Sequence, residues 1–96
     1  MRLDILFEVF TRDGKRIYLT KKQWSHLSQR HPEMQGLIEE IQHALIQPTH
    51  ILNFGNETIK YYLSLKTKRC YLMVAVKLVN NDEGFIMTSY LTKKIY

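Results

Sequence analysis

The fold of this 96-residue chain is decided mainly by one stretch of its second half, IKYYLSLKTKRCYLMVAVKLV, residues 59–79. Within it, residues 59–65 and 71–79 alternate between apolar and other side chains with the period of two that is typical of a β-strand. Residues 67–69 between them are polar and suit a turn. We therefore predict two antiparallel strands, each with one face toward the core.

Strand patterns continue on both sides of this stretch. Residues 51–54 and 85–92 are rich in apolar side chains, and turn-forming residues at 55–56 and 80–84 separate them from their neighbours. The second half of the chain therefore predicts an antiparallel meander of four strands.

The first thirty residues predict a hairpin followed by a helix. Residues 3–10 and 16–19 have strand composition, and the Asp-Gly dipeptide between them favours a tight hairpin turn. Thr20 and Gln23 then have the spacing of a capping box, which predicts a helix that ends at about residue 30.

A second helix is predicted to begin at Pro32, because proline suits the first position of a helix. Its apolar stripe consists of Leu37, Ile38, Ile41, Ala44 and Leu45. The predicted fold class is therefore α+β, with an N-terminal β-hairpin, two helices, and then an antiparallel β-meander packed on the helices. At this length we expect a single domain over residues 1–96.

Composition narrows the class of partner. Fourteen Lys and Arg against nine Asp and Glu give a net charge of +5, which favours nucleic acid, an acidic protein or a membrane surface. The apolar stretches have only strand length and the N-terminus lacks the features of a secretory signal, so we expect a cytoplasmic protein with no membrane partner. The single cysteine, Cys70, is expected to be a reduced strand thiol, although neighbouring Lys68 and Arg69 leave a reactive thiol open.

One face of the predicted meander gathers lysines, tyrosines and hydroxyl groups. Strand alternation assigns to this face Lys60, Lys66, Lys77, Tyr62, Tyr71, Tyr90, Thr88 and Thr92. Lysines neutralise phosphates, tyrosines stack on unpaired bases, and hydroxyl groups reach the 2′-OH of RNA. The pattern predicts a surface for single-stranded RNA; the alternative is an ordinary solvated sheet face, which has a similar composition.

The last predicted strand, residues 85–92, completes this face. Its core set is expected to be Phe85, Met87, Ser89 and Leu91, with Ile86 on the opposite side. In the hairpin with residues 71–79, we expect Lys77 to lie near Thr88 and Ala75 to lie near Tyr90.

The histidines add candidates for catalysis. His26 and Arg30 are four residues apart and so share one face of the first helix. A histidine beside a fixed cation suits phosphodiester chemistry, because the imidazole moves protons and the cation stabilises charge on the phosphorane. The alternative for His26 is an exposed helix residue, and for His31 a cap of the second helix or a contact in the core. No histidine pair has the spacing of a metal site, so neither a metal nor another cofactor is expected.

Several segments resemble the phage-type branch of the barnase–EndoU–colicin–RelE-like (BECR) nucleases. Together they span about residues 14–92, and they are GKRIYLT (14–20), WSHL (24–27), RHPEM (30–34), YLMVAVK (71–77) and FIMTSYLT (85–92). The resemblance implies a metal-independent ribonuclease fold with helices packed on an antiparallel sheet. Families of this kind often act as toxins of toxin–antitoxin pairs or as effector nucleases.

Carried over by position, the resemblance implies a set of catalytic residues, namely His26, Arg30, Lys77, Thr88 and Tyr90. His26 would act as general base or acid, Lys77 with Arg30 would neutralise the phosphorane, and the two hydroxyl residues would position the phosphate or the 2′-OH. The residues predicted to bind RNA are Lys60, Tyr62, Lys66, Tyr71, Thr92 and His31.

The predicted reaction is endonucleolytic cleavage of RNA, in which the 2′-OH attacks the adjacent phosphate and leaves 2′,3′-cyclic phosphate and 5′-OH ends. The expected partners are RNA, either free or as ribosome-associated mRNA or tRNA, and an acidic antitoxin protein. The alternative is a non-catalytic RNA- or protein-binding module on the same fold, because a fold alone does not determine a function.

Overall fold

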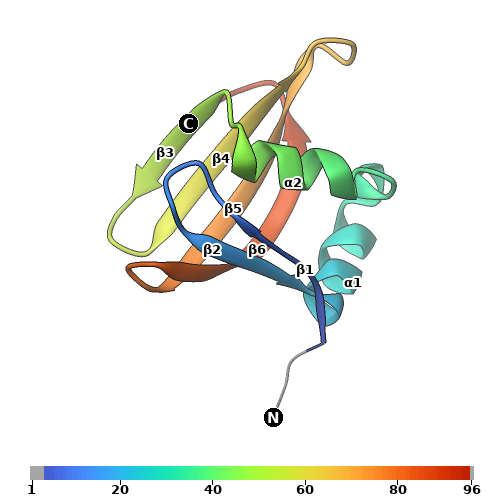
Figure 1. Cartoon of the computed structure of the whole chain (residues 1–96). Helices are drawn as coiled ribbons and strands as arrows, with labels where there is room; N and C mark the ends of the chain where they lie inside the picture. Colours follow the sequence, from blue (N-terminus) through green and yellow to red (C-terminus); the bar gives the residue numbers. More distant parts are fainter. Residues whose placement is uncertain (1–3, 96) are drawn as a thin grey trace.

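The computed structural model describes residues 4–95, and in this part of the chain one six-stranded mixed sheet is combined with two α-helices (Figure 1). The strands are β1 (Ile5–Phe10), β2 (Arg16–Thr20), β3 (His50–Phe54), β4 (Thr58–Leu65), β5 (Cys70–Asn80) and β6 (Glu83–Thr92). The helices are α1 (Lys21–Arg30) and α2 (Ile38–Ile46), with the short 3-10 helix η1 (Pro32–Met34) between them. The predicted α+β class is confirmed. The predicted first strand began at Leu3, which lies outside the described residues.

The strand order across the sheet is β1-β2-β6-β5-β4-β3. Neighbouring strands from β3 to β6 are antiparallel, as predicted for the meander. The hairpin of β1 and β2 joins this meander through a parallel pairing of β2 with β6, in which Tyr18 lies opposite Phe85. This pairing was not predicted, since it joins segments that are far apart in the sequence.

The second helix begins later than predicted. Pro32 begins the 3-10 helix η1, and α2 starts only at Ile38. Gly36 separates the two with a φ of +85°, a conformation that glycine adopts readily and that interrupts a right-handed helix. The prediction of a continuous helix from Pro32 is therefore wrong.

The main core lies between the sheet and the two helices. Leu27, Met34, Ile41 and Leu45 pack against fully buried strand residues such as Val74. In Figure 1, α2 crosses one side of the sheet while α1 stands at its margin beside β1 and β6. The predicted core-facing alternation of β4 and β5 is confirmed. Within residues 4–95, no helix is both long and apolar enough to cross a membrane.

A β-bulge changes which side chains of β6 face the core. Ala75 lies opposite Thr88, and the next residue of β5, Val76, lies opposite Ile86, so that Met87 is an extra residue in β6. An extra residue reverses the alternation of a strand. Ile86 is therefore fully buried in the main core, against the prediction, whereas Phe85 and Met87 lie outside it.

The side of the sheet that faces away from α2, here called the second face, is more covered than predicted. Tyr62 is only 1% exposed, Met73 1% and Ala75 4%. Packed around them are Leu52, Tyr71, Met87, Tyr90 and Ile95. The chain after β6 turns back at Thr92, whose hydroxyl accepts from the backbone N–H of Lys94 at 3.2 Å, and Ile95 then packs on this cluster. Tyr62 is thus not the open stacking surface that was predicted.

Tyr61 anchors the β1–β2 turn to the core. Its hydroxyl donates to Asp13 Oδ1 at 2.9 Å, Thr11 Oγ1 donates to the same oxygen at 2.5 Å, and the backbone N–H of Arg12 donates to the Leu45 carbonyl at 3.1 Å. Burial of the phenol raises the pKa of Tyr61 well above its usual range, and the negative charge of Asp13 raises it further. The predicted Asp-Gly turn is therefore held against both β4 and α2.

Candidate active-site cleft

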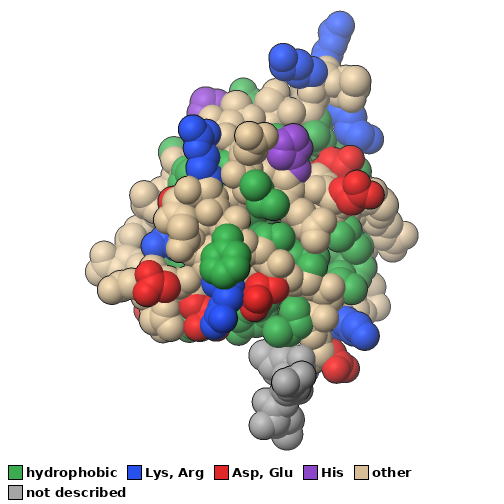
Figure 2. Space-filling model, in the orientation of Figure 1, with side chains coloured by type: hydrophobic (Ala, Val, Ile, Leu, Met, Phe, Trp, Pro, Cys, Tyr) green, Lys and Arg blue, Asp and Glu red, His purple; other side chains and the backbone are tan. Residues whose placement is uncertain are grey.

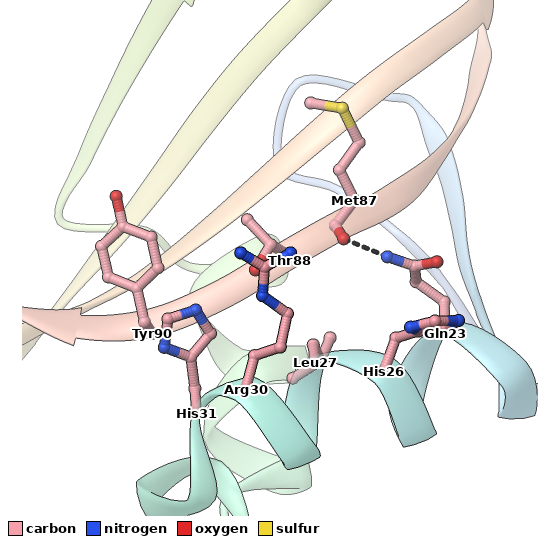
Figure 3. Close-up of a pocket in the computed structure, with 8 residues that line it drawn as sticks. All are labelled: Gln23, His26, Leu27, Arg30, His31, Met87, Thr88 and Tyr90. Atoms are coloured by element: carbon pink, nitrogen blue, oxygen red, sulfur yellow. Dashed lines mark hydrogen bonds between the residues drawn. The ribbon is translucent and has the colours of Figure 1, made fainter.

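A cleft of about 430 Å³ lies between α1 and β6 (Figure 3). Its lining residues are Gln23, His26, Leu27, Arg30, His31, Met87, Thr88 and Tyr90. Five of the residues that were predicted to act in catalysis or RNA binding are among them. The structure therefore brings side chains of α1 and β6 together, although these segments are far apart in the sequence. The prediction had grouped these side chains by their chemical roles alone.

The helix side of the cleft comes from one face of α1. Leu27 is buried in the core, and Gln23, His26 and Arg30 stand beside it at the three- and four-residue spacing that places side chains on one helix face. His26 and Arg30 are exposed. Among the described residues, neither side chain has a hydrogen-bond or ion-pair partner. Figure 3 shows Arg30 directed toward β6 and His26 next to Gln23.

Gln23 fastens α1 to the bulge of β6. Its side-chain amide donates to the Met87 carbonyl, as the dashed line in Figure 3 marks. Its backbone N–H donates to Thr20 Oγ1 at 3.1 Å, which confirms the predicted N-cap. In a capping box the Gln side chain would bond back to the N-cap backbone. Here the Gln23 side chain donates to the Met87 carbonyl instead. The capping-box interpretation therefore did not identify Gln23 as a residue of the cleft.

His31 closes the far end of the cleft. Its backbone N–H donates to the Leu27 carbonyl at 2.8 Å, so His31 is the C-cap of α1. Its ring lies against the ring of Tyr90, with the two centroids 5.1 Å apart and an interplanar angle of 41°. Nδ1 is 3.7 Å from Glu33 Oε2, which is within ion-pair distance when the imidazole is protonated. The His31 side chain makes no hydrogen bond that caps the helix beginning at Pro32, and it lines the cleft instead.

The strand side of the cleft depends on the alternation of β6 beyond the bulge. Thr88 and Tyr90 project to the same side, and Ser89 between them is fully buried on the other side. The Ser89 hydroxyl donates to the Met73 carbonyl of β5 at 2.6 Å. This buried hydrogen bond holds β6 in the orientation that directs Thr88 and Tyr90 into the cleft.

Lys77 does not lie where it was predicted. The register of β5 and β6 places Phe85 opposite Lys77 and Ala75 opposite Thr88. The strands are joined by the two residues between Asn80 and Glu83, a shorter turn than predicted, which shifts the pairing. Lys77 is exposed and is not among the residues that line the cleft.

The predicted RNA-binding tyrosines are packed on one another on the second face. The Tyr71 ring lies 6.0 Å from that of His50 and 6.4 Å from that of Tyr62, edge-on in both cases. Thr92 is half-buried opposite Tyr71. Of this group, Tyr71 and Thr92 keep exposed surface, and Tyr62 keeps almost none.

The remaining lysines divide between the second face and one end of the sheet. Lys60 Nζ lies 4.7 Å from the ring centroid of Phe54, a cation–π contact on β3. Lys66 is exposed in the β4–β5 turn. This turn lies at the same end of the sheet as the segment after β6, because Leu65 pairs with Cys70 and Tyr71 with Thr92.

The basic end, as we call this part of the molecule, consists of Lys66, Lys68, Arg69, Lys93 and Lys94. In Figure 2, Lys and Arg side chains stand out where the β4–β5 turn projects in Figure 1. The opposite end carries both signs of charge, with Glu57, Asp82 and Glu83 beside Lys15, Arg16 and Lys77, and Glu83 binds Arg16 at 2.8 Å. Four members of the basic end were absent from the predicted site, because the prediction followed the alternation within the strands and did not extend to the residues beyond their ends.

No group of three or more His, Cys, Asp or Glu side chains is arranged to hold a metal ion in the part of the chain that the structure describes. Cys70 is a free, half-buried thiol at the start of β5. Comparisons with protein-family models, with curated proteins and with solved structures found no match to this chain.

Proposed function

We propose that this chain is an endoribonuclease that acts in the cleft between α1 and β6, on a scaffold of the BECR type. The observation that carries the proposal is the composition of the cleft, which joins two imidazoles, a guanidinium, a phenol and a hydroxyl group. The order of a hairpin, two helices and a strand meander, in which the first helix and the last strand supply the cleft, supports the proposed relationship.

The groups of the cleft match the needs of RNA cleavage by an internal nucleophile. The 2′-OH must lose a proton as its oxygen bonds to phosphorus, and the 5′-oxygen must gain a proton as its bond to phosphorus breaks. His26 and His31 are at opposite ends of the cleft wall that contains Arg30. One imidazole therefore takes the first proton, and the other, in its protonated form, supplies the second.

Arg30 is the cation for the reacting phosphate in this proposal. Its guanidinium extends between the helix and β6, and a guanidinium donates paired hydrogen bonds to phosphate oxygens. Thr88 and Tyr90 face it from β6 and would position the phosphate or the 2′-OH. Lys77 lies outside the cleft, and we assign it a contact with the RNA backbone instead of with the phosphorane.

The charge distribution supports a nucleic-acid substrate. Tyr90 lies two residues before Thr92, the last residue of β6. Lys93 and Lys94 of the basic end follow Thr92 directly. An RNA strand that occupies the cleft could therefore continue toward positive charge. The same surfaces would suit an acidic antitoxin that covers the active site in the cytoplasm. Inhibition of cleavage by an acidic polypeptide would be the evidence for such a partner.

The test of the proposal compares two histidines. Purified wild-type protein, His26→Ala and His43→Ala are incubated with labelled single-stranded RNA in EDTA. His43 is an exposed residue of α2 outside the cleft and serves as the control. We expect His26→Ala to lose about a hundredfold or more in rate and His43→Ala to lose none. Equal cleavage by all three would place the reaction elsewhere, and salt-sensitive binding without cleavage would favour a non-catalytic RNA-binding module.

A further inference from the structure

A second cavity, of about 230 Å³, lies beside the cleft at the N-terminal end of α1. It is lined by Tyr18, Thr20, Gln23, Phe85 and Ile86. Gln23 lines both cavities, and the wall continues along β6 from Met87 to its preceding neighbours Ile86 and Phe85. The cleft and this second cavity are therefore neighbours, and the Gln23 side chain, which bonds to the Met87 carbonyl, borders both of them.

The topology of the sheet creates the cavity. The parallel pairing of β2 and β6 covers only three residue pairs and ends where Tyr18 lies opposite Phe85. Beyond that pair β2 leads into α1, whereas β6 continues along the cleft. Ile86, which is fully buried, lines the space between the two diverging segments. The chain thus forms a recess at a fork in the sheet.

Two aromatic rings flank this recess. The rings of Tyr18 and Phe85 have centroids 6.2 Å apart and an interplanar angle of 38°. Both residues are half-buried, so part of each ring remains accessible. Aromatic side chains beside a phosphate-binding groove are the usual surface on which proteins stack the unpaired bases of single-stranded nucleic acid.

Polar groups lie at the border between the recess and the cleft. The amide nitrogen of Gln23 is occupied by the Met87 carbonyl, and Figure 3 shows its oxygen on the other side, away from Met87. This oxygen accepts no hydrogen bond from the described residues. The Thr20 hydroxyl accepts from the backbone of Gln23 and keeps its own proton to donate. An acceptor and a donor therefore stand next to the two rings.

We propose that this recess is a nucleobase subsite. In an RNA whose phosphate occupies the cleft, the base of an adjacent nucleotide enters the recess and stacks on Tyr18 and Phe85. The carboxamide oxygen of Gln23 accepts a hydrogen bond from an N–H group on the edge of that base. The assignment rests on the proposed function for the place of the phosphate, and it makes Gln23 the residue that connects base recognition to the cleavage site.

The distances along the strand agree with this arrangement. Strand residues rise by about 3.4 Å each, so Phe85 and Thr88 are separated by roughly 10 Å along β6, less the shortening caused by the bulge. One nucleotide can therefore place its phosphate near Thr88 and direct its base toward Phe85.

The subsite is tested with a strand that cannot be cleaved. A labelled oligonucleotide with 2′-O-methyl groups at every position lacks the nucleophile, and its affinity is measured by fluorescence anisotropy. A matched series carries a single abasic nucleotide at each position in turn. Phe85→Leu and Tyr18→Leu remove one ring each and keep an apolar side chain. Phe10→Leu is the control, because Phe10 is 68% exposed, lies near Arg16 and Glu83, and is outside both cavities.

We expect Phe85→Leu and Tyr18→Leu each to weaken binding of the intact strand about fivefold or more, and Phe10→Leu to leave it unchanged. One abasic position should weaken binding to the wild type more than to Phe85→Leu, since both changes remove the stacking on Phe85, whereas Tyr18 and Gln23 still contact the base in the variant. Equal losses on intact and abasic strands would overturn the subsite, as would unchanged affinity of both ring variants. Because the strand is inert, binding that follows the prediction in a protein that never cleaves RNA would remove the ribonuclease proposal and leave the subsite in place.

Discussion

Among the single residues of the cleft, Arg30 gives the most specific prediction for catalysis. Arginine remains charged at every pH at which a protein is folded, and its planar fork gives paired hydrogen bonds that lysine cannot reproduce. We expect Arg30→Ala to lower kcat by about a hundredfold or more, with a smaller loss for Arg30→Lys. Arg12→Ala is the control, because Arg12 is an exposed turn residue whose described contact uses only its backbone N–H. Similar rates for Arg30→Ala and Arg12→Ala would exclude Arg30 from the reaction.

Tyr61 predicts how stability depends on pH. Its pKa in the folded protein is raised, so the folded state holds the proton more tightly than the unfolded state does. The free energy of unfolding should therefore be unaffected by this group below about pH 10 and should fall as the pH rises above that value. Urea titrations between pH 7 and pH 11 measure this slope.

Tyr61→Phe separates this contribution from that of other groups. At pH 7 the variant should lose about 1 kcal/mol, because it lacks the hydrogen bond to Asp13, and its alkaline slope should be shallower than that of the wild type. Tyr18→Phe, which changes a half-buried tyrosine away from that bond, should keep the steeper slope. Parallel alkaline slopes for wild type and Tyr61→Phe would contradict the assignment.

Among the elements, β6 shows why strand pattern alone did not place every side chain. The alternation in β4 and β5 was predictable because their pairing is uninterrupted and one face of each packs against the helices. The bulge at Met87 depends on the match between two strands, and no residue within β6 signals it. The same limit moved Lys77 away from Thr88, since register is a property of a pair of strands.

The cleft was predictable where one element determined the geometry. His26 and Arg30 share a face of α1 at any register, and Thr88 and Tyr90 alternate together beyond the bulge. Gln23 was missed because its sequence position also fits a helix cap. The second cavity was not predicted, because neither strand sequence indicates the parallel pairing of β2 with β6.

Gly84 tests the close contact between β5 and β6. A Cβ atom at this position would lie 2.5 Å from the Lys77 carbonyl oxygen and 3.1 Å from Leu78 Cα, both of which are backbone atoms. Gly84→Ala should therefore lower the free energy of unfolding by about 1–3 kcal/mol, because the strands must move apart. Asn81→Ala in the adjoining turn should change it by less than about 0.5 kcal/mol. A Gly84→Ala variant as stable as the wild type in urea would show that the strands are further apart there.

At the scale of the whole molecule, positive charge without acidic neighbours gathers at the basic end, whereas the opposite end of the sheet mixes Glu57, Asp82 and Glu83 with Lys15, Arg16 and Lys77. If the basic end follows the RNA backbone, each lost phosphate contact should reduce the slope of log Kd against log salt by about 0.7 for a single strand. We expect this reduction for Lys68→Ala and for Arg69→Ala. Lys15→Ala is the control, because Lys15 Nζ donates to the Asn81 carbonyl at the end of the sheet opposite the basic end. Equal slopes for all three variants would show that RNA does not follow the basic end.

The central claim is that the 2′-OH of the RNA is the nucleophile that the α1–β6 cleft activates. It is tested most directly by mapping one cleavage site in EDTA and then replacing the nucleotide on its 5′ side by the 2′-deoxy form. The account predicts 2′,3′-cyclic phosphate ends from the all-RNA strand and no cut at the substituted site, while other sites are still cleaved. Cleavage at the substituted site, or no cleavage of any RNA, would contradict it.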